Sequence, residues 1–338
     1  MDDVRGTVEE PMFKDKTFLI TGGTGSFGQT IVEKLLRSDI KSVKVFSRDE
    51  AKQDLMRQKI SDKRVSFCLG DIRNFESVKN AVFGVDYLFH AAALKQVPTS
   101  EDFPWEFVQT NIQGTHNVLR ALEGSSVEKA VFLSTDKAVY PVNAMGMTKA
   151  LMEKLVKSTK YSYSAIPIIT RYGNVIGSRG SVIPYFIESI KNFGLVKVTN
   201  PQMTRFMMSL DESVELVLFA FANGKSGDLF VQKSPAANVI TIVKALEILM
   251  SSKEIQIDEI GVRPGEKMHE TLLTIEERNS CIESDLYFQV KRIDLESNNQ
   301  NLQKPELVDY SSDNTKLLSS SELATLLNNN SQIKKLLL

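Results

Sequence analysis

The feature that most constrains the fold of this chain is an alternation of short apolar runs with amphipathic helical segments over residues 16–177. Six apolar runs predict strands, at 16–23, 42–49, 64–72, 85–93, 128–136 and 165–177. Segments with helical periodicity lie between them, at 26–39, 50–60, 75–83, 104–124 and 143–159. Such alternation is typical of right-handed βαβ crossovers. The sequence therefore predicts an α/β fold of Rossmann type, with a doubly wound parallel sheet.

The loop after the first expected strand is rich in glycine and has the sequence "TGGTGSFG" at residues 21–28. In such a loop the first glycine permits a tight turn, the second lets the backbone approach a pyrophosphate, and the third permits close packing of helix on strand. A glycine pattern alone also fits a plain turn, but this one ends a strand and opens a helix. The loop therefore predicts a dinucleotide site at Gly22, Thr24, Gly25, Ser26, Phe27 and Gly28.

The loop after the second expected strand bears on which dinucleotide is bound. It contains Ser47, Arg48 and Lys52, but also the acidic Asp49 and Glu50. Cations on a ribose 2′-phosphate favour NADP, whereas an acid on the 2′-hydroxyl favours NAD. Because Arg48 comes first after the strand, we expect NADP rather than NAD. The alternative is that all these charges are solvated at the start of a helix.

Two further strand ends are expected to meet the same cofactor. Asp71 and Ile72 follow the third strand and are placed to reach the adenine, although a plain turn fits this pair nearly as well. The fourth strand ends in small residues that would let the cofactor approach the backbone, namely Ala91, Ala92 and Ala93. Lys95 follows them, and it is expected either to contact bound ligand or to be solvated.

Composition excludes several classes of function. The 338 residues include 41 basic and 42 acidic side chains, so the near-neutral charge gives no reason to expect nucleic acid or a membrane surface as partner. No apolar run reaches the ~18–20 residues needed to span a bilayer. Two distant cysteines favour a reducing cytoplasm over a disulfide framework, and three scattered histidines predict no metal site. Residues 1–11 are polar and are expected to form a flexible lead-in.

The motifs of this chain, taken in order, resemble those of the extended short-chain dehydrogenases/reductases. These are "TGGTGSFG", "GDI", "HAAA", "STDK" and "MGMTK". The "TDK" triplet, "RYGNVIGSRGSVIP" at 171–184 and "RPGEKMHE" at 263–270 narrow the resemblance to configuration-inverting UDP-N-acetylglucosamine 4,6-dehydratases. The chain is most similar to the branch that also epimerises C5, on the way to N-acetyl-L-fucosamine and related sugars of polysaccharides. The resemblance extends from about residue 12 to 275.

This resemblance implies a reaction with a tightly bound, recycled NADP. Carbon 4 of the sugar is oxidised, water is eliminated across C5 and C6, and hydride returns to C6. The resemblance also implies roles for three consecutive residues. The Thr135 hydroxyl would bind the C4 oxygen, Asp136 would protonate the leaving C6 hydroxyl, and Lys137, when neutral, would be the base at C5. A surface ion pair at a strand end is the alternative for Asp136 and Lys137.

Met145 raises the main question about this reaction. The family places a tyrosine acid–base group there and a catalytic lysine at Lys149, four residues later on the same helix face. Lys149 is also expected to bind the cofactor, through the nicotinamide ribose. A thioether cannot exchange a proton, although the C5-epimerising branch carries the same methionine. For the C4 hydroxyl we expect Lys137 as the base, with Asp136 or Tyr140 as alternatives. The rival functions are a nucleotide-sugar 4-epimerase or reductase, and an inactive NADP-binding scaffold.

The remaining candidates concern the UDP-sugar. Lys95 could meet the diphosphate, and Asn174 would orient the sugar. Arg205, Arg263 and Glu266 are expected to bind UDP, although exposed arginines often have no such role. We expect a Rossmann domain at 12–177 and a smaller, discontinuous substrate domain at 178–275 that returns to the sheet near 228–232. A C-terminal extension would follow at 276–338, and the family suggests a homo-oligomer.

Overall fold

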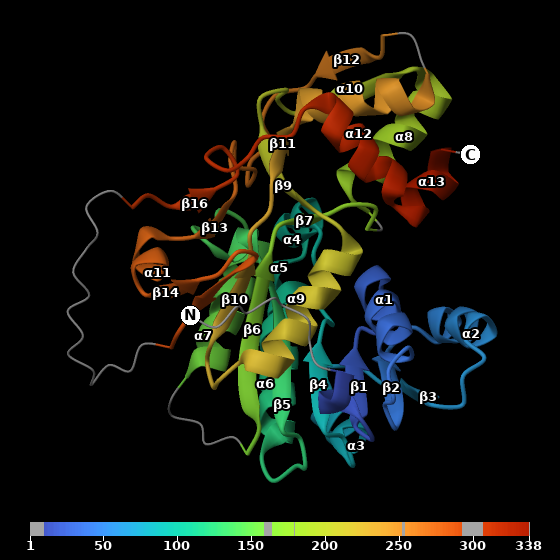
Figure 1. Ribbon diagram of the computed structural model, residues 1–338, viewed down its shortest axis with the longest axis vertical. Helices are drawn as coiled ribbons and strands as arrows, with labels where there is room; N and C mark the ends of the chain where they lie inside the picture. The colour runs from blue at the N-terminus through green and yellow to red at the C-terminus, as the bar shows by residue number, and fades with distance from the viewer. Residues whose placement is uncertain (1–9, 159–163, 179, 252–253, 293–306, 338) are drawn as a thin grey trace.

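The computed structural model describes residues 10–158, 164–178, 180–251, 254–292 and 307–337, which form two lobes (Figure 1). Within these residues the larger lobe holds a nine-stranded sheet of order β14-β15-β10-β6-β5-β4-β1-β2-β3. Its parallel strands are β1 (Thr17–Thr21), β2 (Ser42–Ser47), β3 (Val65–Leu69), β4 (Tyr87–His90), β5 (Lys129–Thr135), β6 (Ile166–Tyr172) and β10 (Leu229–Gln232). Two antiparallel strands continue it, β15 (Tyr287–Val290) and β14 (Cys281–Glu283).

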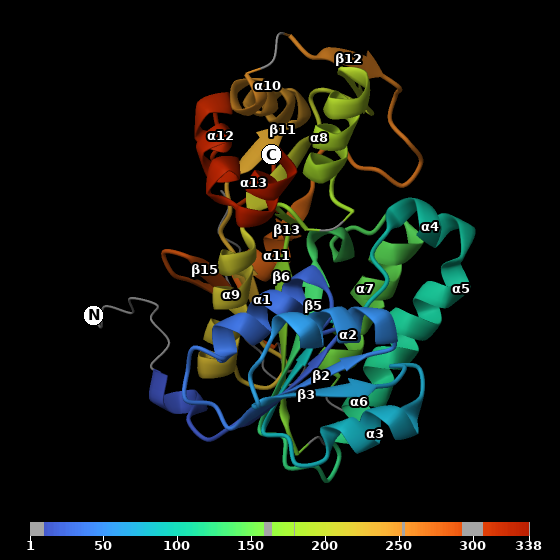
Figure 2. The same ribbon diagram turned by 90° about the vertical axis from the view of Figure 1, so that its right-hand side faces the viewer.

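Helices cover both faces of this sheet (Figure 2). One face carries α1 (Ser26–Leu35), α2 (Glu50–Lys59) and α9 (Leu210–Asn223), and the other carries α3 (Phe75–Val82), α6 (Gly114–Leu122) and α7 (Ala144–Lys157). Strand β1 illustrates the cause. Phe18 and Ile20 belong to the core on the face of α1, α2 and α9, and Leu19 belongs to the core on the face of α3, α6 and α7. Apolar side chains on both strand faces require two helical layers. The predicted α/β Rossmann fold with a parallel sheet is confirmed.

The smaller lobe is assembled from segments that follow β6. A three-stranded sheet contains β7 (Asn174–Val175), β9 (Thr204–Met208) and β11 (Ala236–Asn238), and a second pair joins β8 (Leu195–Val198) to β12 (Gln256–Glu259). Helices pack around a shared apolar core, namely α8 (Val182–Phe193), α10 (Val239–Met250), α12 (Ser320–Asn329) and α13 (Ser331–Leu337). Helices α12 and α13, at the end of the described chain, therefore belong to the small lobe.

Several short elements complete the described part of the chain. In the chain they are η1 (Glu10–Phe13), α4 (Val97–Asp102), α5 (Pro104–Phe107), the π-helical turn η2 (Val108–Gln113), η3 (Asp136–Ala138), β13 (Thr271–Leu273), α11 (Ile275–Asn279) and β16 (Tyr310–Ser311). The chain passes between the two lobes repeatedly, because α9 packs on the large sheet and β10 and β15 join that sheet. The domain limits drawn from the sequence remain a prediction, and residues 1–9 of the expected lead-in lie outside the described residues.

Two expected elements differ in the structure. The sixth strand was expected over 165–177, but β6 ends at Tyr172 and the next residues form β7 in a different sheet. Gly173 permits this break, because a Cβ there would lie 2.5 Å from the Cβ of Phe206. The helix expected over 104–124 is interrupted by η2, whose Asn111 side chain bonds both the N–H and the carbonyl of Leu94. Among the described helices, none is both long and apolar enough to cross a membrane.

A buried ionic network ties the large lobe to residues 271–279. The Arg171 guanidinium donates to both carboxylate oxygens of Glu153 in α7, at 2.9 and 2.5 Å, and to Glu277 in α11, at 2.7 Å. It also donates to the Leu272 carbonyl at 2.8 Å. Burial raises the pKa of Glu153, but the neighbouring Arg171 outweighs it and lowers that pKa below its usual value. The network is therefore charged, and each member depends on its partners.

We expect Arg171→Met to lower the free energy of unfolding by about 3–5 kcal/mol, because it leaves Glu153 buried and without its main cation. Lys34→Met is the matched control, since Lys34 pairs with Glu215 at 2.6 Å with side chains 43 % and 39 % exposed. An exposed pair of this kind contributes about 1 kcal/mol or less. Urea denaturation followed by circular dichroism measures both, and equal losses in the two variants would contradict the role given to the network.

Candidate active site

A cavity of about 770 Å³ lies along the carboxyl edge of the parallel sheet. Its floor is the point where the chain order reverses between β1 and β4, which is where ligands bind in doubly wound sheets. All sixteen residues expected to bind the cofactor line this cavity. The loops that carry these residues therefore surround one space, and their contacts with a ligand stay predictions.

The glycine loop forms the wall of the cavity below α1. Gly22 has φ +68°, and a Cβ on it would lie 2.8 Å from the backbone nitrogen of Ala92. A Cβ on Gly28 would lie 2.4 Å from the Cα of Gly23, so only glycine lets α1 pack this close. Gly25 caps α1 without a side chain, which leaves the backbone N–H groups of the first turn facing the cavity. This geometry suits the pyrophosphate of a dinucleotide.

The loops after β2 and β3 bring both cations and acids to one end of the cavity. Arg48 Nη1 lies 4.0 Å from Asp71 Oδ2, and its side chain is 53 % exposed. Lys52 donates to Asp49 at 2.5 Å. The Asp71 carboxylate accepts a bidentate pair from Arg73; burial raises the pKa of Asp71, but these hydrogen bonds bring it below its usual value. Asp71 therefore anchors two arginines here, and its expected contact with adenine stays a prediction.

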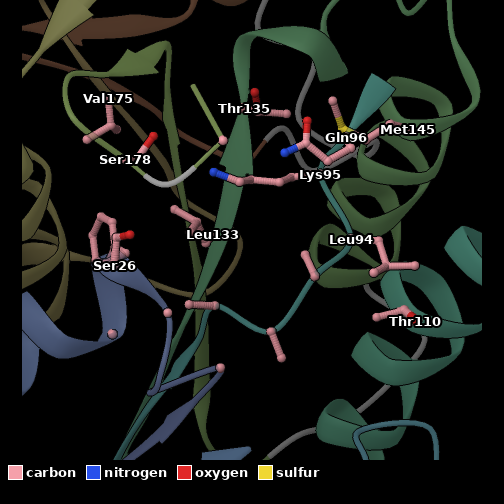
Figure 3. Close-up of a pocket in the computed structure, with 18 of the residues that line it drawn as sticks. Ser26, Leu94, Lys95, Gln96, Thr110, Leu133, Thr135, Met145, Val175 and Ser178 are labelled. Carbon is pink, nitrogen blue, oxygen red and sulfur yellow. The ribbon is translucent and has the colours of Figure 1, made fainter. Parts of the chain in front are cut away.

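The loop after β4 crosses the middle of the cavity. In Figure 3 the side chain of Lys95 extends into the cavity between Thr135 and Leu133. Asn111 fixes the backbone of the preceding Leu94 and also donates to Thr148 in α7, at 3.0 Å. Asn111, in the π-helical turn η2, thus fixes the backbone next to Lys95.

Thr135, Asp136 and Lys137 form one hydrogen-bonded cluster where β5 ends. The Thr135 hydroxyl donates to Asp136 Oδ1 at 2.9 Å, and Lys137 Nζ donates to the same oxygen at 3.0 Å. Asp136 is fully buried, and its Oδ2 has no hydrogen-bond partner among the described residues. Thr135 and Lys137 line the cavity, whereas Asp136 lies just behind them.

The two lysines of the site differ in how firmly they hold a proton. Burial lowers the pKa of Lys137, but the carboxylates of Asp136 and Glu270 outweigh it and raise that pKa above its usual value. Burial lowers the pKa of Lys149 to about 8, and its amine donates to the Leu133 carbonyl at 2.6 Å. The neutral Lys137 expected from the sequence is therefore not the form favoured without substrate.

Met145 and Tyr140 occupy different environments. Met145 is 3 % exposed and lines the cavity one helical turn from Lys149, as its spacing predicted. Tyr140 is 54 % exposed, does not line the cavity, and directs its hydroxyl to Asp309 at 3.5 Å. Burial and the neighbouring acid raise the pKa of Tyr140. Both observations argue against Tyr140 as the C4 base.

The expected substrate residues are only partly brought together. Lys95 and Asn174 line the cavity, and Asn174 Oδ1 is buried without a partner among the described residues. Arg205, Arg263 and Glu266 lie outside the cavity lining. Arg205 donates instead to the carbonyls of Thr204 and Met268, at 2.7 and 3.3 Å. A role of these three residues in UDP binding remains a prediction.

Other functional candidates were missed from the sequence. Lys267 and Glu270 follow Arg263 in the same motif, and Glu270 Oε1 lies 3.5 Å from Lys137 Nζ. Both residues are charged and lie in a motif that was already expected to have a function, and this was the signal that could have identified them. The start of α8 also borders the cavity, through Ser178, Gly180, Ser181 and Val182. Among the described residues, no cluster of His, Cys, Asp or Glu could hold a metal ion.

Comparison with known proteins gives relatives along most of the chain. UDP-glucose 4-epimerase of Rickettsia rickettsii (strain Sheila Smith) is 48 % identical over 332 residues, which cover 94 % of this chain and 96 % of the relative. The protein of the same name from Rickettsia prowazekii (strain Madrid E) matches with the same figures. The X-ray structure of Pen from Bacillus thuringiensis has a TM-score of 0.88 and 37 % identity, covering 95 % of this chain and 99 % of that one.

A more distant structure supports the fold alone. DesIV, a dTDP-glucose 4,6-dehydratase from Streptomyces venezuelae, has a TM-score of 0.69 and 21 % identity, covering 75 % of this chain and 86 % of its own. The family described as "Polysaccharide biosynthesis protein" matches residues 18–292, which include the glycine loop, the Thr135–Lys137 cluster and the 263–270 motif. The chain belongs to this polysaccharide biosynthesis family.

Proposed function

We propose that this protein is a UDP-N-acetylglucosamine 4,6-dehydratase that inverts C5, and that it forms UDP-2-acetamido-2,6-dideoxy-L-hexos-4-ulose for polysaccharide synthesis. The observation that carries the proposal is the Thr135–Asp136–Lys137 cluster, in which a hydroxyl and an amine that line the cavity both donate to a buried carboxyl directly behind them. Water elimination needs an acid and a base in addition to redox chemistry. A site that only oxidises and reduces C4 has no use for all three groups.

The cavity fits NADP as the resident cofactor. The glycine loop and the first turn of α1 would hold the pyrophosphate, Arg48 and Lys52 would meet the 2′-phosphate, and Lys149 would lie near the nicotinamide ribose. When bound, this cofactor accepts a hydride from C4 and returns it to C6. The chain itself must then supply every proton transfer.

Proton balance favours Asp136 over Lys137 for the C4 step. Removal of the C4 hydroxyl proton and of the C5 proton requires two acceptors, whereas expulsion of the C6 hydroxyl as water consumes one proton. An ionised Asp136 takes the first proton through the Thr135 hydroxyl, which lines the cavity and donates to Asp136 Oδ1, and it delivers the proton by the same route to the C6 hydroxyl. A neutral Lys137 takes the C5 proton and returns one to C5 with inversion. Both groups end as they began, so the active form has Asp136 charged and Lys137 uncharged.

A 4-epimerase is the second candidate, because the relatives at 48 % identity carry the name UDP-glucose 4-epimerase. Such an enzyme must let a 4-ketosugar turn over in the site, and it retains the C6 hydroxyl. It would need a base at C4 but no acid at C6 and no base at C5, which would leave the placement of Lys137 beside Asp136 unexplained.

Incubation of the protein with NADP and UDP-N-acetylglucosamine in deuterated water separates the two candidates. The dehydratase gives a 4-keto-6-deoxy sugar with deuterium at C5 and no net change in NADPH absorbance, as NMR and mass spectrometry would detect. A C4 epimer formed without loss of water, from this substrate or from UDP-glucose, would replace the proposal with the epimerase. Absence of any product would leave a cofactor-binding scaffold.

In the same assay we expect Lys137→Ala to reduce turnover at least ~100-fold, because a general base is removed. Its Kd for NADP should stay within about threefold of the wild type. Lys154→Ala is the matched control, since Lys154 is exposed on the outer side of α7. Wild-type rates in Lys137→Ala would refute the proton assignment.

We expect Arg48→Ala to weaken NADP binding about 10- to 100-fold and to change NAD binding little, because a charge-assisted contact contributes about 1.5–3 kcal/mol. Arg57→Ala provides the control, since Arg57 lies on α2 but does not line the cavity. Isothermal titration with each cofactor measures the ratio. An equal loss for both cofactors would remove the argument for NADP selectivity.

A further inference from the structure

Lys137 is held by two carboxylates, and the mechanism proposed above uses only one of them. Its amine lies 3.0 Å from Asp136 Oδ1 and 3.5 Å from Glu270 Oε1. Glu270 is 3 % exposed and does not line the cavity, whereas its neighbour Lys137 does. A buried carboxylate is costly unless it is compensated by charge. Its place beside the C5 base therefore needs an explanation.

The structure fixes Glu270 firmly in this position. Its backbone N–H donates to the Ser312 hydroxyl at 2.9 Å, and the Ser312 N–H donates to the Glu270 carbonyl at 2.8 Å. Ser312 is itself fully buried and shares a 2.6 Å hydrogen bond with the Thr204 hydroxyl. Immediately after Glu270, β13 pairs with β16. The backbone of Glu270 is thus held by Ser312 and by the strand pairing that follows, which limits how far the carboxylate can move from Lys137.

The second oxygen of Glu270 faces another cation. Glu270 Oε2 lies 3.5 Å from Lys267 Nζ and has no hydrogen-bond partner among the described residues. Lys267 in turn donates to the carbonyl of Val139, two residues after Lys137, at 2.6 Å. Residues 267–270 therefore clamp the loop that carries Lys137. The charges that act on Lys137 are Asp136 from η3, Glu270 from this segment and Arg205 from β9, with Lys267 behind Glu270.

We propose that Glu270 is a positioning residue of the reaction: it is the second anionic anchor of Lys137 and controls how readily that amine gives up its proton. The catalytic part of this inference rests on the proposed function, in which Lys137 acts as a neutral base. In the resting enzyme, the carboxylate of Glu270 favours the protonated form of Lys137, so the ion pairs of Lys137 with Asp136 and Glu270 are kept. It also sets the pH above which the amine is ready to accept the C5 proton.

The direct test measures the protonation of Lys137 without relying on turnover. Competitive labelling with acetic anhydride over a pH series, read by mass spectrometry, follows the neutral fraction of each lysine. Glu270→Gln keeps the shape of the side chain and removes its charge, so the Lys137 midpoint should fall by about one to two pH units. At a fixed pH below both midpoints, labelling then rises about tenfold for each unit. Lys149, with a pKa of about 8, is the internal reference and should not move.

Two further variants control the sign of the effect. Lys267→Met removes a cation from the far side of Glu270 and should move the Lys137 midpoint upward, which also keeps the proposal testable if Glu270→Gln does not fold. Glu276→Gln makes the same charge change at an exposed position of α11 and should move neither lysine. An unchanged Lys137 midpoint in folded Glu270→Gln, or equal shifts in Glu270→Gln and Glu276→Gln, would overturn the proposal.

The catalytic readout is the dependence of kcat on pH for the NADP-loaded enzyme with UDP-N-acetylglucosamine. Because the active amine is neutral, kcat rises with pH, and Glu270→Gln should move this rise to lower pH by about the same amount as the labelling midpoint. A purely structural role would lower kcat at every pH without moving the rise, and would overturn the proposal. If labelling shifts while no variant forms product, the proposed function fails but the anchoring of Lys137 by Glu270 stands.

Discussion

The parallel direction of the central strands is the constraint on which the site depends. Because β1 to β5 all run the same way, their carboxyl ends meet along one edge of the sheet. The glycine loop, Arg48, Lys95 and the Thr135–Lys137 cluster come together for this reason alone, although long helices separate them in the sequence. The small lobe then closes the edge with the start of α8. Position in the sheet, rather than any local sequence signal, makes these residues neighbours.

Buried charge explains how residues 263–277 are attached to this edge. At one end Glu270 meets Lys137, and at the other Glu277 meets Arg171, which also holds Glu153. Burying such groups is favourable only when each retains a partner, so the two networks define one docking position for the segment. An apolar contact would tolerate sliding, whereas these paired charges do not. The segment thereby holds a carboxylate 3.5 Å from Lys137, the base of the proposed reaction.

Sequence reasoning reached the parts of the structure that are encoded by local pattern. The alternation of strands and helices predicted the helical layers on the sheet, and the spacing of Gly22, Gly25 and Gly28 predicted the glycine loop that forms one wall of the cavity. Both signals lie within a few residues of each other in the sequence. The prediction from sequence failed where contacts between distant segments determine the structure. The break at Gly173 depends on the packing of Phe206, and the outward course of Tyr140 depends on Asp309. The contact of Glu270 with Lys137 joins segments with no shared periodicity, so the sequence drew attention to Arg263 and Glu266 in this motif but not to Glu270.

The missing phenol is best understood from the two lysines together. Lys149 gives up a proton more easily, because burial lowers its pKa to about 8 beside the apolar Met145 and Met152, but its amine is committed to the Leu133 carbonyl. Lys137 holds its proton more firmly, yet it lies next to the carboxyl that the elimination requires. Ease of deprotonation therefore does not select the base; placement does. In the proposed reaction a methionine at position 145 would therefore cost little, because the proton chemistry would take place at the end of β5 rather than on α7, and Glu270 would regulate it there.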